Sequence, residues 1–331
     1  MREVAAGPAH NSTSADVARL AGVSRGAVSQ ILNGHGGRFA AATRERVLDA
    51  ARTLAYEPSL AGRTLARGKS DVVVAVVPHT TFGANLQDIL EVMTDELARN
   101  GLMLVTRFST PDVASFDGFI AAVQPVAVVT MADLAEDHLD VLRSRRARLV
   151  GAADTSNENT DANRTGHDLV GALQARHLFD RGHRNLAYAH LKDRRQNLYG
   201  QPRFDGFRGA CNELGLPEPD VIDLAIDSDE AIARLRKLDG STAIACYNDD
   251  VALTLLSAGQ HLGIAVPAGL ALVGVDNTAL GRAAFPRLST IGYEADAIAR
   301  MLTHRVLSTV GMAVPAPPAS PRYEIIQGGT S

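Results

Sequence analysis

Two short amphipathic patterns separated by Gly22, within residues 14–34, constrain this chain more than any other feature of its sequence. Ser14 is placed to cap a first helix and Ser24 a second, while Gly22 permits the backbone to turn between them. Apolar residues recur at helical spacing in both segments and should pack inward: Val17, Ala18 and Leu20, then Ala27, Val28, Ile31 and Leu32. Two helices joined by such a turn form the outline of a helix-turn-helix motif.

The outward face of the second helix carries small groups and hydrogen-bond donors: Arg25, Gly26, Ser29, Gln30 and Asn33. This composition suits the major groove of DNA, where Arg can pair with guanine and Gln with adenine through two hydrogen bonds each. A helical hairpin with a solvated face is the alternative interpretation. A third helix predicted over residues 43–58, with Val47, Ala50, Ala51 and Leu54 on one face, would close a three-helix core and favours DNA binding.

A linker and a region of alternating elements follow. Residues 58–70, PSLAGRTLARGKS, indicate a linker with helical potential. Beyond them, amphipathic helical stretches separate short apolar runs, predicted as strands at 72–77, 102–106, 126–130, 149–153, 186–189, 243–247, 270–275 and 322–327. This alternation predicts parallel sheets with helices on both faces. We therefore expect an α/β protein with an all-α N-terminal headpiece: a helix-turn-helix domain over 1–57, a linker over 58–70 and a core over 71–331.

Composition indicates a soluble, cytoplasmic protein of more than one domain. The 331 residues are 46% hydrophobic and 21% charged, which is ordinary for a globular chain. The apolar runs are far shorter than the ~20 residues that span a bilayer, and residues 1–14 lack the apolar core of a secretory signal. The two cysteines, Cys211 and Cys246, fit a reducing compartment and packing roles.

Charge is distributed unevenly along the chain. Residues 1–70 carry ten Lys and Arg against five Asp and Glu, whereas the remaining residues carry 23 against 32. The net charge is only −4, but its basic part coincides with the predicted helix-turn-helix domain. Such asymmetry suits contact with phosphates, although a solvated surface or an RNA-binding module could also have it.

Polar side chains directly after the predicted core strands are candidates for a ligand site, because ligands bind beyond the carboxyl ends of strands in open parallel sheets. Asn248 follows IACY, Asp276 follows LVGV, and Arg203 opens the helix after the strand ending near Ala189. Together they could hold hydroxyls or an acidic group of an effector. The alternatives are structural: Asn248 and Asp249 as helix caps, Asp276 in an Asx turn, and Arg203 paired with Asp205.

Two other classes of protein share part of this pattern. A solute-binding protein could have the same core, but it would be exported and would not need residues 1–70. An enzyme could use Asp249, Asp250 and Asp276 as acid and base. The chain has no GxGxxG after a strand, no GxxxxGK[ST], no GxSxG and no metal-spaced His/Cys set, so we expect no catalytic residue, cofactor or metal.

A series of motifs resembles the lactose-repressor (LacI/GalR) family. They are DVA, LAGVS, VS and LNG within 16–34, TRERV and LAYEP within 43–58, ARGKS before Asp71, then RGHRNLAYA, RFDGF, CYNDDVAL, PAGLALVGVDN and PRLSTI in the core. Their order and spacing span nearly the whole chain. The resemblance implies a hinge helix in the linker and two doubly wound, periplasmic-binding-protein-like subdomains, with crossovers near residues 165 and 293.

The resemblance also implies two sets of site residues. Those implied for DNA are Thr13, Ser14, Ser24, Arg25, Gly26, Ala27, Ser29, Gln30, Asn33, Ser59, Gly62 and Leu65, the last as a wedge in the minor groove. Those implied for the effector are Arg203, Asn248, Asp276, His79, Phe82, Asn85, Asn197 and Tyr199. Phe82, Ala84 and Asn85 stand where sugar-binding relatives have paired aromatics, which argues against a pyranose effector.

Other positions depart from the family pattern. Gln30 stands where Arg is frequent, and Gly62 in the hinge weakens helix formation by roughly 0.5–1 kcal/mol relative to Ala. Ala40 stands where a capping Ser or Thr is expected, which should weaken the start of the third helix by ~1 kcal/mol.

The function implied by the resemblance is that of a cytoplasmic, nucleoid-associated transcriptional repressor. It would act as a homodimer on a palindromic DNA operator under the control of a small effector such as a sugar, polyol, nucleobase or related metabolite, with no membrane partner. A constitutive DNA-binding regulator with a non-functional cleft is the alternative. The residues leave open the effector, induction or corepression, the operator and the regulated genes; no heptads follow Gln327, which favours a dimer over a tetramer.

Overall fold

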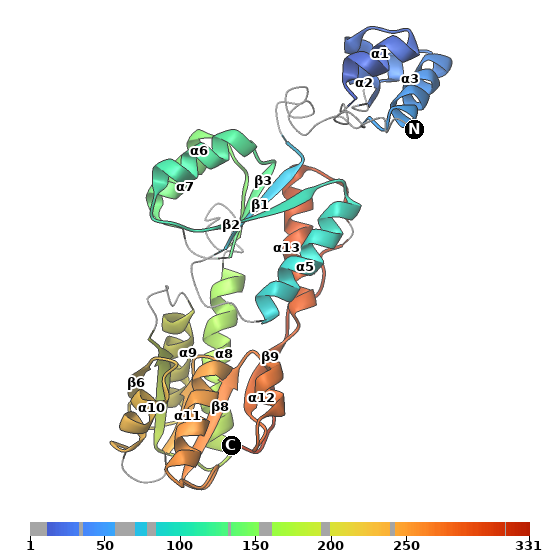
Figure 1. The fold of residues 1–331 in the computed structure, drawn as a ribbon. Helices are drawn as coiled ribbons and strands as arrows, with labels where there is room; N and C mark the ends of the chain where they lie inside the picture. Colours follow the sequence, from blue (N-terminus) through green and yellow to red (C-terminus); the bar gives the residue numbers. More distant parts are fainter. Residues whose placement is uncertain are drawn as a thin grey trace, which may run out of the picture. The chain divides into compact units, whose positions relative to one another are not determined.

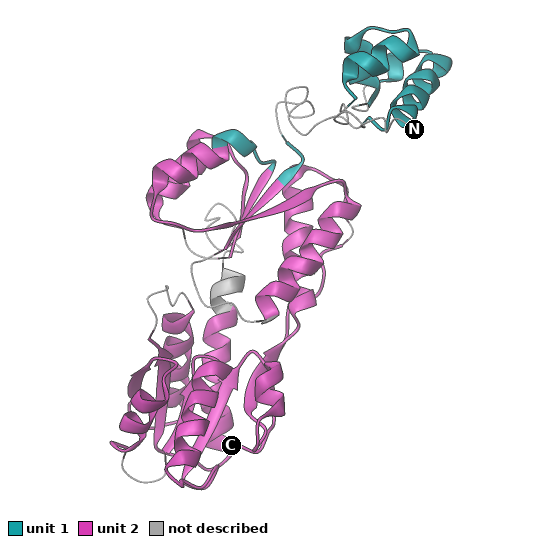
Figure 2. Cartoon of the chain, viewed as in Figure 1, with its two compact units in different colours: residues 1–72, 121–126 teal, residues 73–120, 127–331 magenta. Residues whose placement is uncertain are grey.

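The computed structural model describes residues 12–32, 36–56, 70–77, 84–131, 134–151, 161–192, 199–238, 242–314 and 316–331. The chain divides into two compact units, residues 1–72 with 121–126 and residues 73–120 with 127–331 (Figure 2). The predicted hinge residues Ser59, Gly62 and Leu65 lie outside the described residues.

The N-terminal part is the predicted small helical domain (Figure 1). Its elements are α1 (Ser14–Ala21), α2 (Arg25–Leu32), the short 3-10 helix η1 (Gly36–Arg38) and α3 (Ala41–Thr53). Gly22 has φ 66°, a left-handed conformation that ends α1 and turns the chain into α2. Of the residues predicted for it on α2 and α3, the core contains Val28, Ile31, Val47, Ala50 and Ala51, and Leu32 and Leu54 pack against it partly buried. Ala27 was also predicted to pack inward, but it is half-buried and is not part of this core.

Two predictions for α1 were wrong. Its N-cap is Thr13, not Ser14: the Thr13 hydroxyl accepts from the Asp16 N–H, and the Asp16 carboxylate accepts from the Thr13 N–H at 2.9 Å. This reciprocal pair satisfies backbone donors that a Ser14 cap would leave open, and it lowers the pKa of Asp16. Leu20 is 55% exposed rather than part of the core, because Val17, Ala18 and Ala21 already fill the inward face. Ser24 caps α2 as predicted, accepting from the Ala27 N–H at 3.2 Å.

The larger of the two compact units, residues 73–120 with 127–331, is the core unit, and it is built on two sheets. The first has the strand order β2-β1-β3-β4, with β1–β3 and β3–β4 parallel. Its elements are β1 (Val72–Val77), α5 (Ala84–Arg99), β2 (Met103–Phe108), α6 (Val113–Val123), β3 (Ala127–Thr130), α7 (Glu136–Ser144) and β4 (Leu149–Gly151). In Figure 1, α6 and α7 lie on one side of this sheet and α5 on the other. β1 is buried along its whole length, as expected for a continuous apolar run covered on both faces.

The second sheet has the strand order β10-β9-β8-β7-β5-β6, parallel except for the antiparallel pair β10–β9. Its strands are β5 (Leu186–Leu191), β6 (Asp220–Leu224), β7 (Thr242–Cys246), β8 (Leu270–Val275), β9 (Ser289–Tyr293) and β10 (Tyr323–Ile326). Its helices are α8 (Asp161–Asp180), α9 (Gly200–Glu213), α10 (Ser228–Leu235), α11 (Asp249–His261) and α12 (Ala279–Ala283). Alternate strand residues enter two cores, one with α8 and α9 and one with α10 and α11.

The chain passes between the two sheets three times. It leaves the first sheet after β4 and enters the second through α8 and β5. It returns after β9 into α13 (Ala295–Val310), which packs beside α5, β3 and β4, and then rejoins the second sheet as β10. Both cysteines are free and buried, in agreement with their predicted packing roles.

Candidate functional site

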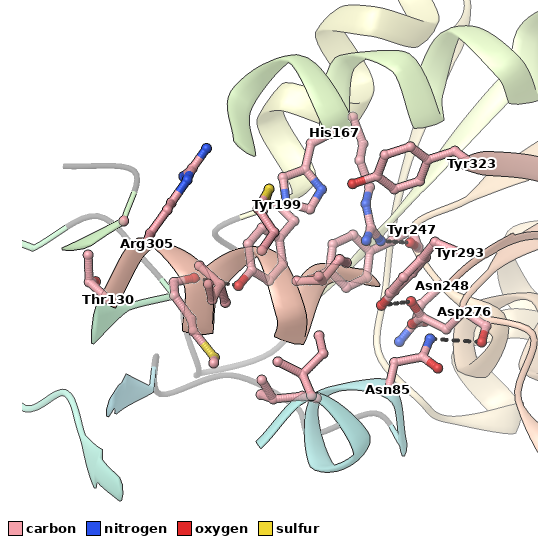
Figure 3. A pocket seen from close by; sticks show the side chains of 18 residues that line it. Asn85, Thr130, His167, Tyr199, Tyr247, Asn248, Asp276, Tyr293, Arg305 and Tyr323 are labelled. Carbon is pink, nitrogen blue, oxygen red and sulfur yellow. Dashed lines mark hydrogen bonds between the residues drawn. The ribbon is translucent and has the colours of Figure 1, made fainter. Parts of the chain in front are cut away.

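A cavity of about 130 Å³ lies in the core unit (Figure 3). It is lined by Asn85, Leu86, Ile89, Thr130, Met131, Gly151, His167, Tyr199, Arg203, Tyr247, Asn248, Asp276, Tyr293, Ile298, Met301, Leu302, Arg305 and Tyr323. These residues come from both sheets and from the helices that follow their strands. Five predicted effector residues are among them: Arg203, Asn248, Asp276, Asn85 and Tyr199. His79, Phe82 and Asn197 lie outside the described residues.

Asp276 follows β8 in an unusual backbone conformation. Its φ is 104°, and that of Asn277 is 49°, in a region that non-glycine residues rarely occupy. The Tyr293 hydroxyl donates to Asp276 Oδ1 at 3.1 Å, and Asn85 Nδ2 donates to the Asp276 carbonyl at 2.9 Å. These bonds hold the Asp276 carboxylate on the cavity wall, and the second joins α5 to the end of β8.

Arg203 lines the cavity and is buried, with only 4% of its surface exposed. Its Nη1 donates to the Tyr247 carbonyl at 2.5 Å, while its Nε has no partner among the described residues. Burial is the largest single effect and disfavours the guanidinium charge, but the nearby Asp276 carboxylate, together with the hydroxyls of Tyr247, Tyr188 and Tyr293, raises the pKa of Arg203 overall. Asp205 bonds to Arg208 and Gln201 instead, so the alternative pairing of Arg203 with Asp205 does not occur.

Asn248 combines a structural role with its place in the cavity wall. Its Oδ1 accepts from the Val251 N–H at 3.1 Å and so caps α11, in agreement with the structural alternative. Asp249, the next residue, is fully buried, and its carboxylate accepts from the hydroxyls of Thr290 and Thr278. Burial raises the pKa of Asp249 to about 6. Asp249 thus ties α11 to β9 and α12 behind the cavity and is not one of its lining residues.

The middle of the cavity is formed by His167 and Tyr199. Their rings stack with centroids 4.4 Å apart, and the Tyr199 hydroxyl donates to the Met131 carbonyl at 2.6 Å. Burial, together with the positive charge of Arg203, lowers the pKa of His167 to about 3. His167 is therefore neutral near pH 7.

Close packing of α8 and α9 brings His167 and Arg203 to the same cavity. A Cβ on Gly171 would overlap the Arg203 carbonyl, and a Cβ on Gly206 would overlap the Asp168 carbonyl. Gly171 of α8 faces α9, and Gly206 of α9 faces α8. The two backbones therefore approach more closely than any larger residue at these positions would permit.

Several aromatic residues of the cavity were missed by the sequence analysis. Four of the six tyrosines of the chain line it: Tyr199, Tyr247, Tyr293 and Tyr323. Only Tyr199 was predicted. Tyr247 ends the predicted strand 243–247, so the rule that identified Asn248 and Asp276 could have found it. Tyr293 ends β9, a strand that the sequence did not predict, so the rule could not reach it.

The candidate DNA-reading face is on α2. Arg25 and Gly26 are exposed in its first turn, Ser24 is exposed at its N-cap, and Ala27, Ser29 and Gln30 are half-buried. Thr13 is exposed and Ser14 half-buried at the start of α1, while Asn33 lies outside the described residues.

Comparison with known proteins identifies the family. The model described as bacterial regulatory proteins, lacI family, matches residues 13–59, and that of the periplasmic binding protein-like domain matches residues 175–331. Catabolite control protein A of Priestia megaterium is 28% identical over 316 residues, covering 88% of this chain and 92% of that protein. The chain belongs to the LacI family of bacterial regulatory proteins.

Other relatives of this LacI-family chain agree. The HTH-type transcriptional repressor PurR of Vibrio parahaemolyticus is 29% identical over 293 residues, covering 85% of this chain and 86% of that protein. The solved lac repressor dimer, bound to operator and the anti-inducer ONPF, has a TM-score of 0.75 at 20% identity and covers 97% of this chain and 99% of that one. The solved complex of the regulator CelR with cellobiose has a TM-score of 0.65 at 21% identity, with coverage of 97% and 100%.

These relatives are transcriptional regulators, which confirms that the LacI-family chain is not an enzyme. Among the described residues, no group of three or more His, Cys, Asp or Glu side chains could hold a metal ion. The helices in the described part of the chain are all too short or too polar to cross a membrane.

Proposed function

We propose that this protein is a repressor that binds a palindromic operator as a homodimer and is controlled by a small molecule in the described cavity. The observation that carries the proposal is the meeting of Arg203, Asn248 and Asp276 at one cavity, in a chain that begins with a helix-turn-helix domain. The protein would act in the bacterial cytoplasm, at the nucleoid.

Arg25 and Gln30 on α2 would read the operator. Arg25 is exposed, and Gly26 beside it adds no side chain that would hold α2 away from the bases. Arg pairs best with guanine and Gln with adenine in the major groove. One such helix covers only a half-site, so a symmetric dimer and a palindromic operator follow. The lac repressor dimer on its operator supports this assembly.

Effector control would act through contacts across the cavity that link two subdomains, each built on one of the two sheets of the core unit. Asn85 of α5 bonds to the Asp276 carbonyl after β8, and Tyr199 before α9 bonds to the Met131 carbonyl after β3. A molecule that inserts among these groups changes how far the subdomains close. Subdomain closure would change the separation of the two hinges in a dimer, and therefore operator affinity.

The operator proposal is tested by selecting duplexes from a random library at ~0.15 M salt, where non-specific binding is weak. We expect enrichment of a palindrome. Arg25→Ala should relax the preference for guanine at one position of each half-site by roughly 5- to 150-fold. Arg19→Ala is the matched control, because Arg19 is an exposed arginine on α1 paired with Asp16. Equal selectivity of the parent and Arg25→Ala would contradict the assignment.

The effector site is tested with Asp276→Asn. Asn tolerates the left-handed backbone and can still accept from the Tyr293 hydroxyl, so the fold should be retained. We expect unchanged operator affinity and loss of the response to the effector. An unchanged response would contradict the site assignment and favour a constitutive regulator whose cleft does not bind the controlling ligand.

A further inference from the structure

Arg305 lies at one end of the cavity and has no partner among the described residues. It is on α13, and Figure 3 shows it at the opposite end of the labelled side chains from Asp276 and Asn248, with Tyr199 and His167 between them. Its guanidinium forms no hydrogen bond or ion pair with any residue that the structure describes. Arg300, five residues earlier on α13, is by contrast paired with Asp296 at 3.3 Å.

The other charges of the cavity do not balance Arg305. Asp276 is the one carboxylate among the described lining residues, and its charge acts on the buried Arg203. His167 is neutral because its pKa is lowered to about 3. The cavity wall therefore carries one positive charge that no described side chain compensates, and it lies at the Arg305 end.

We propose that the effector is an elongated molecule with an uncharged polar end at Asp276 and Asn248 and an anionic group, phosphate or carboxylate, bound by Arg305. This inference rests on the proposed effector-binding function. The stacked rings of His167 and Tyr199 lie between the two ends and fit the less polar middle of such a molecule. An anionic group bound by Arg305 favours phosphosugars, nucleotides and sugar acids over free sugars and nucleobases as the effector.

The surroundings of Arg305 strengthen this recognition. Apolar side chains of the same helix, Ile298, Met301 and Leu302, line the cavity beside it. A guanidinium near apolar groups loses part of its hydration, so a fixed anion restores more interaction there than in open water. The guanidinium can also donate two parallel hydrogen bonds to a phosphate or carboxylate, which an ammonium group cannot do.

The test compares matched neutral and anionic probes on the full-length protein at constant ionic strength. Suitable sets are glucose, glucose 6-phosphate and gluconate; ribose and ribose 5-phosphate; glycerol and glycerol 3-phosphate; and inosine with its 5′-monophosphate. Binding is first detected by thermal shift and then measured by calorimetry. We expect at least one anionic member to bind at least ten times more tightly than its neutral counterpart, and the phosphate and carboxylate arms identify which anion is preferred.

Variants then assign the anion to Arg305. Arg305→Gln should weaken the anionic probe by on the order of ten- to a hundredfold and leave its neutral counterpart unchanged. Arg305→Lys should fall between the parent and Arg305→Gln, because it keeps the charge but loses the two parallel hydrogen bonds. Arg300→Gln is the control on the same helix and should bind like the parent. Circular dichroism and operator binding verify that each variant is folded.

Three results would overturn the inference: no anionic probe binds, a neutral probe binds as tightly as its anionic counterpart, or Arg305→Gln binds the anionic probe like the parent. The proposed function is judged separately. If a neutral probe shifts operator affinity and loses this effect in Asp276→Asn, the effector site stands and only the anion is wrong. If bound probes leave operator affinity unchanged, effector control itself is contradicted.

Discussion

At the scale of single residues, Gln174 shows how one buried amide organises the cavity from behind. It is fully buried on α8, and its Nε2 donates to the carbonyls of Cys246, Val273 and Gly274 at 2.9, 3.1 and 3.3 Å. These carbonyls belong to the carboxyl ends of β7 and β8, directly before the strand ends that carry Asn248 and Asp276. Gln174 therefore fixes the spacing of two cavity strands without lining the cavity.

Replacing Gln174 with Leu should destabilise the core. The substitution removes the donor shared by three buried carbonyls, which should lower the free energy of unfolding by about 1–3 kcal/mol. Gln260→Leu is the matched control, since the Gln260 amide also donates to a carbonyl, that of Phe285, but is exposed. Urea unfolding followed by circular dichroism measures both variants. An equal change in the two would show that burial of the Gln174 amide has no special effect.

His167 should make stability depend on pH. Its folded pKa of about 3 lies below its ordinary value of 6.5, so the unfolded chain binds more protons between these pH values and acid favours unfolding. Between pH 7.5 and 5.5, the parent should lose about 1.4 kcal/mol relative to His167→Phe, which keeps an aromatic ring beside Tyr199. The difference between the two proteins removes the opposite contribution of Asp249, whose pKa is raised. Parallel pH profiles would contradict a depressed His167 pKa.

Sequence could predict cavity residues where a local rule applies. Asn248 and Asp276 directly follow strongly apolar runs, so their position at a sheet edge follows from the strand pattern. His167 and Arg305 lie within helices, and only tertiary packing brings them to the same cavity. No local pattern distinguishes them from surface residues of an amphipathic helix.

At the scale of elements, the contact between α8 and α9 depends on glycine. Gly206→Ala should force the helices apart, because its Cβ would overlap the backbone of Asp168, and overpacking of this kind typically costs about 1–3 kcal/mol or more. Gly209→Ala is the control on the same helix: its Cβ would meet no atom within 4 Å, and Ala should stabilise the helix by roughly 0.5–1 kcal/mol. Thermal unfolding should shift in opposite directions. A shift of the same sign and size in both would contradict the tight helix contact.

The start of α3 should gain stability from a cap. Its N-cap is Ala40, with φ −57° and ψ 147°, and no side-chain hydrogen bond closes the first turn. Ala40→Ser should stabilise this turn by about 1 kcal/mol and slow amide exchange there roughly fivefold. Ala42→Ser places the same hydroxyl inside the turn and should give no such protection. Hydrogen exchange of the full-length protein measures both, and equal rates in the parent and Ala40→Ser would contradict the missing cap.

Elements with strong local patterns were predicted from sequence, and two strands were not. β1 and β8 are apolar throughout, and β5 and β7 are apolar except for His190 and Thr242, as expected of buried parallel strands. β6 was missed because it is an edge strand with exposed alternate residues and two aspartates, and β9 because its STIGY sequence is short and only partly apolar. These two segments become strands because they pair with strands that are distant in the sequence.

At the scale of the whole molecule, charge separation should govern DNA affinity. Residues 1–70 are basic, whereas the remainder is acidic and would repel phosphates. If the two headpieces of a dimer contact about six phosphates, operator binding should weaken about a thousandfold between ~0.05 and ~0.2 M salt. Fluorescence anisotropy with a labelled operator measures the slope. A nearly salt-independent affinity would contradict binding through the basic headpiece.

The gathering of tyrosines in the cavity gives the protein an optical property of its own. The chain has no tryptophan, and of its six tyrosines only Tyr56 and Tyr188 lie elsewhere. Its near-ultraviolet absorption and emission therefore originate mainly from the cavity wall. A molecule entering the cavity displaces water from these rings and changes their spectrum, so the unlabelled protein reports its own occupancy while DNA binding is followed separately through a labelled duplex.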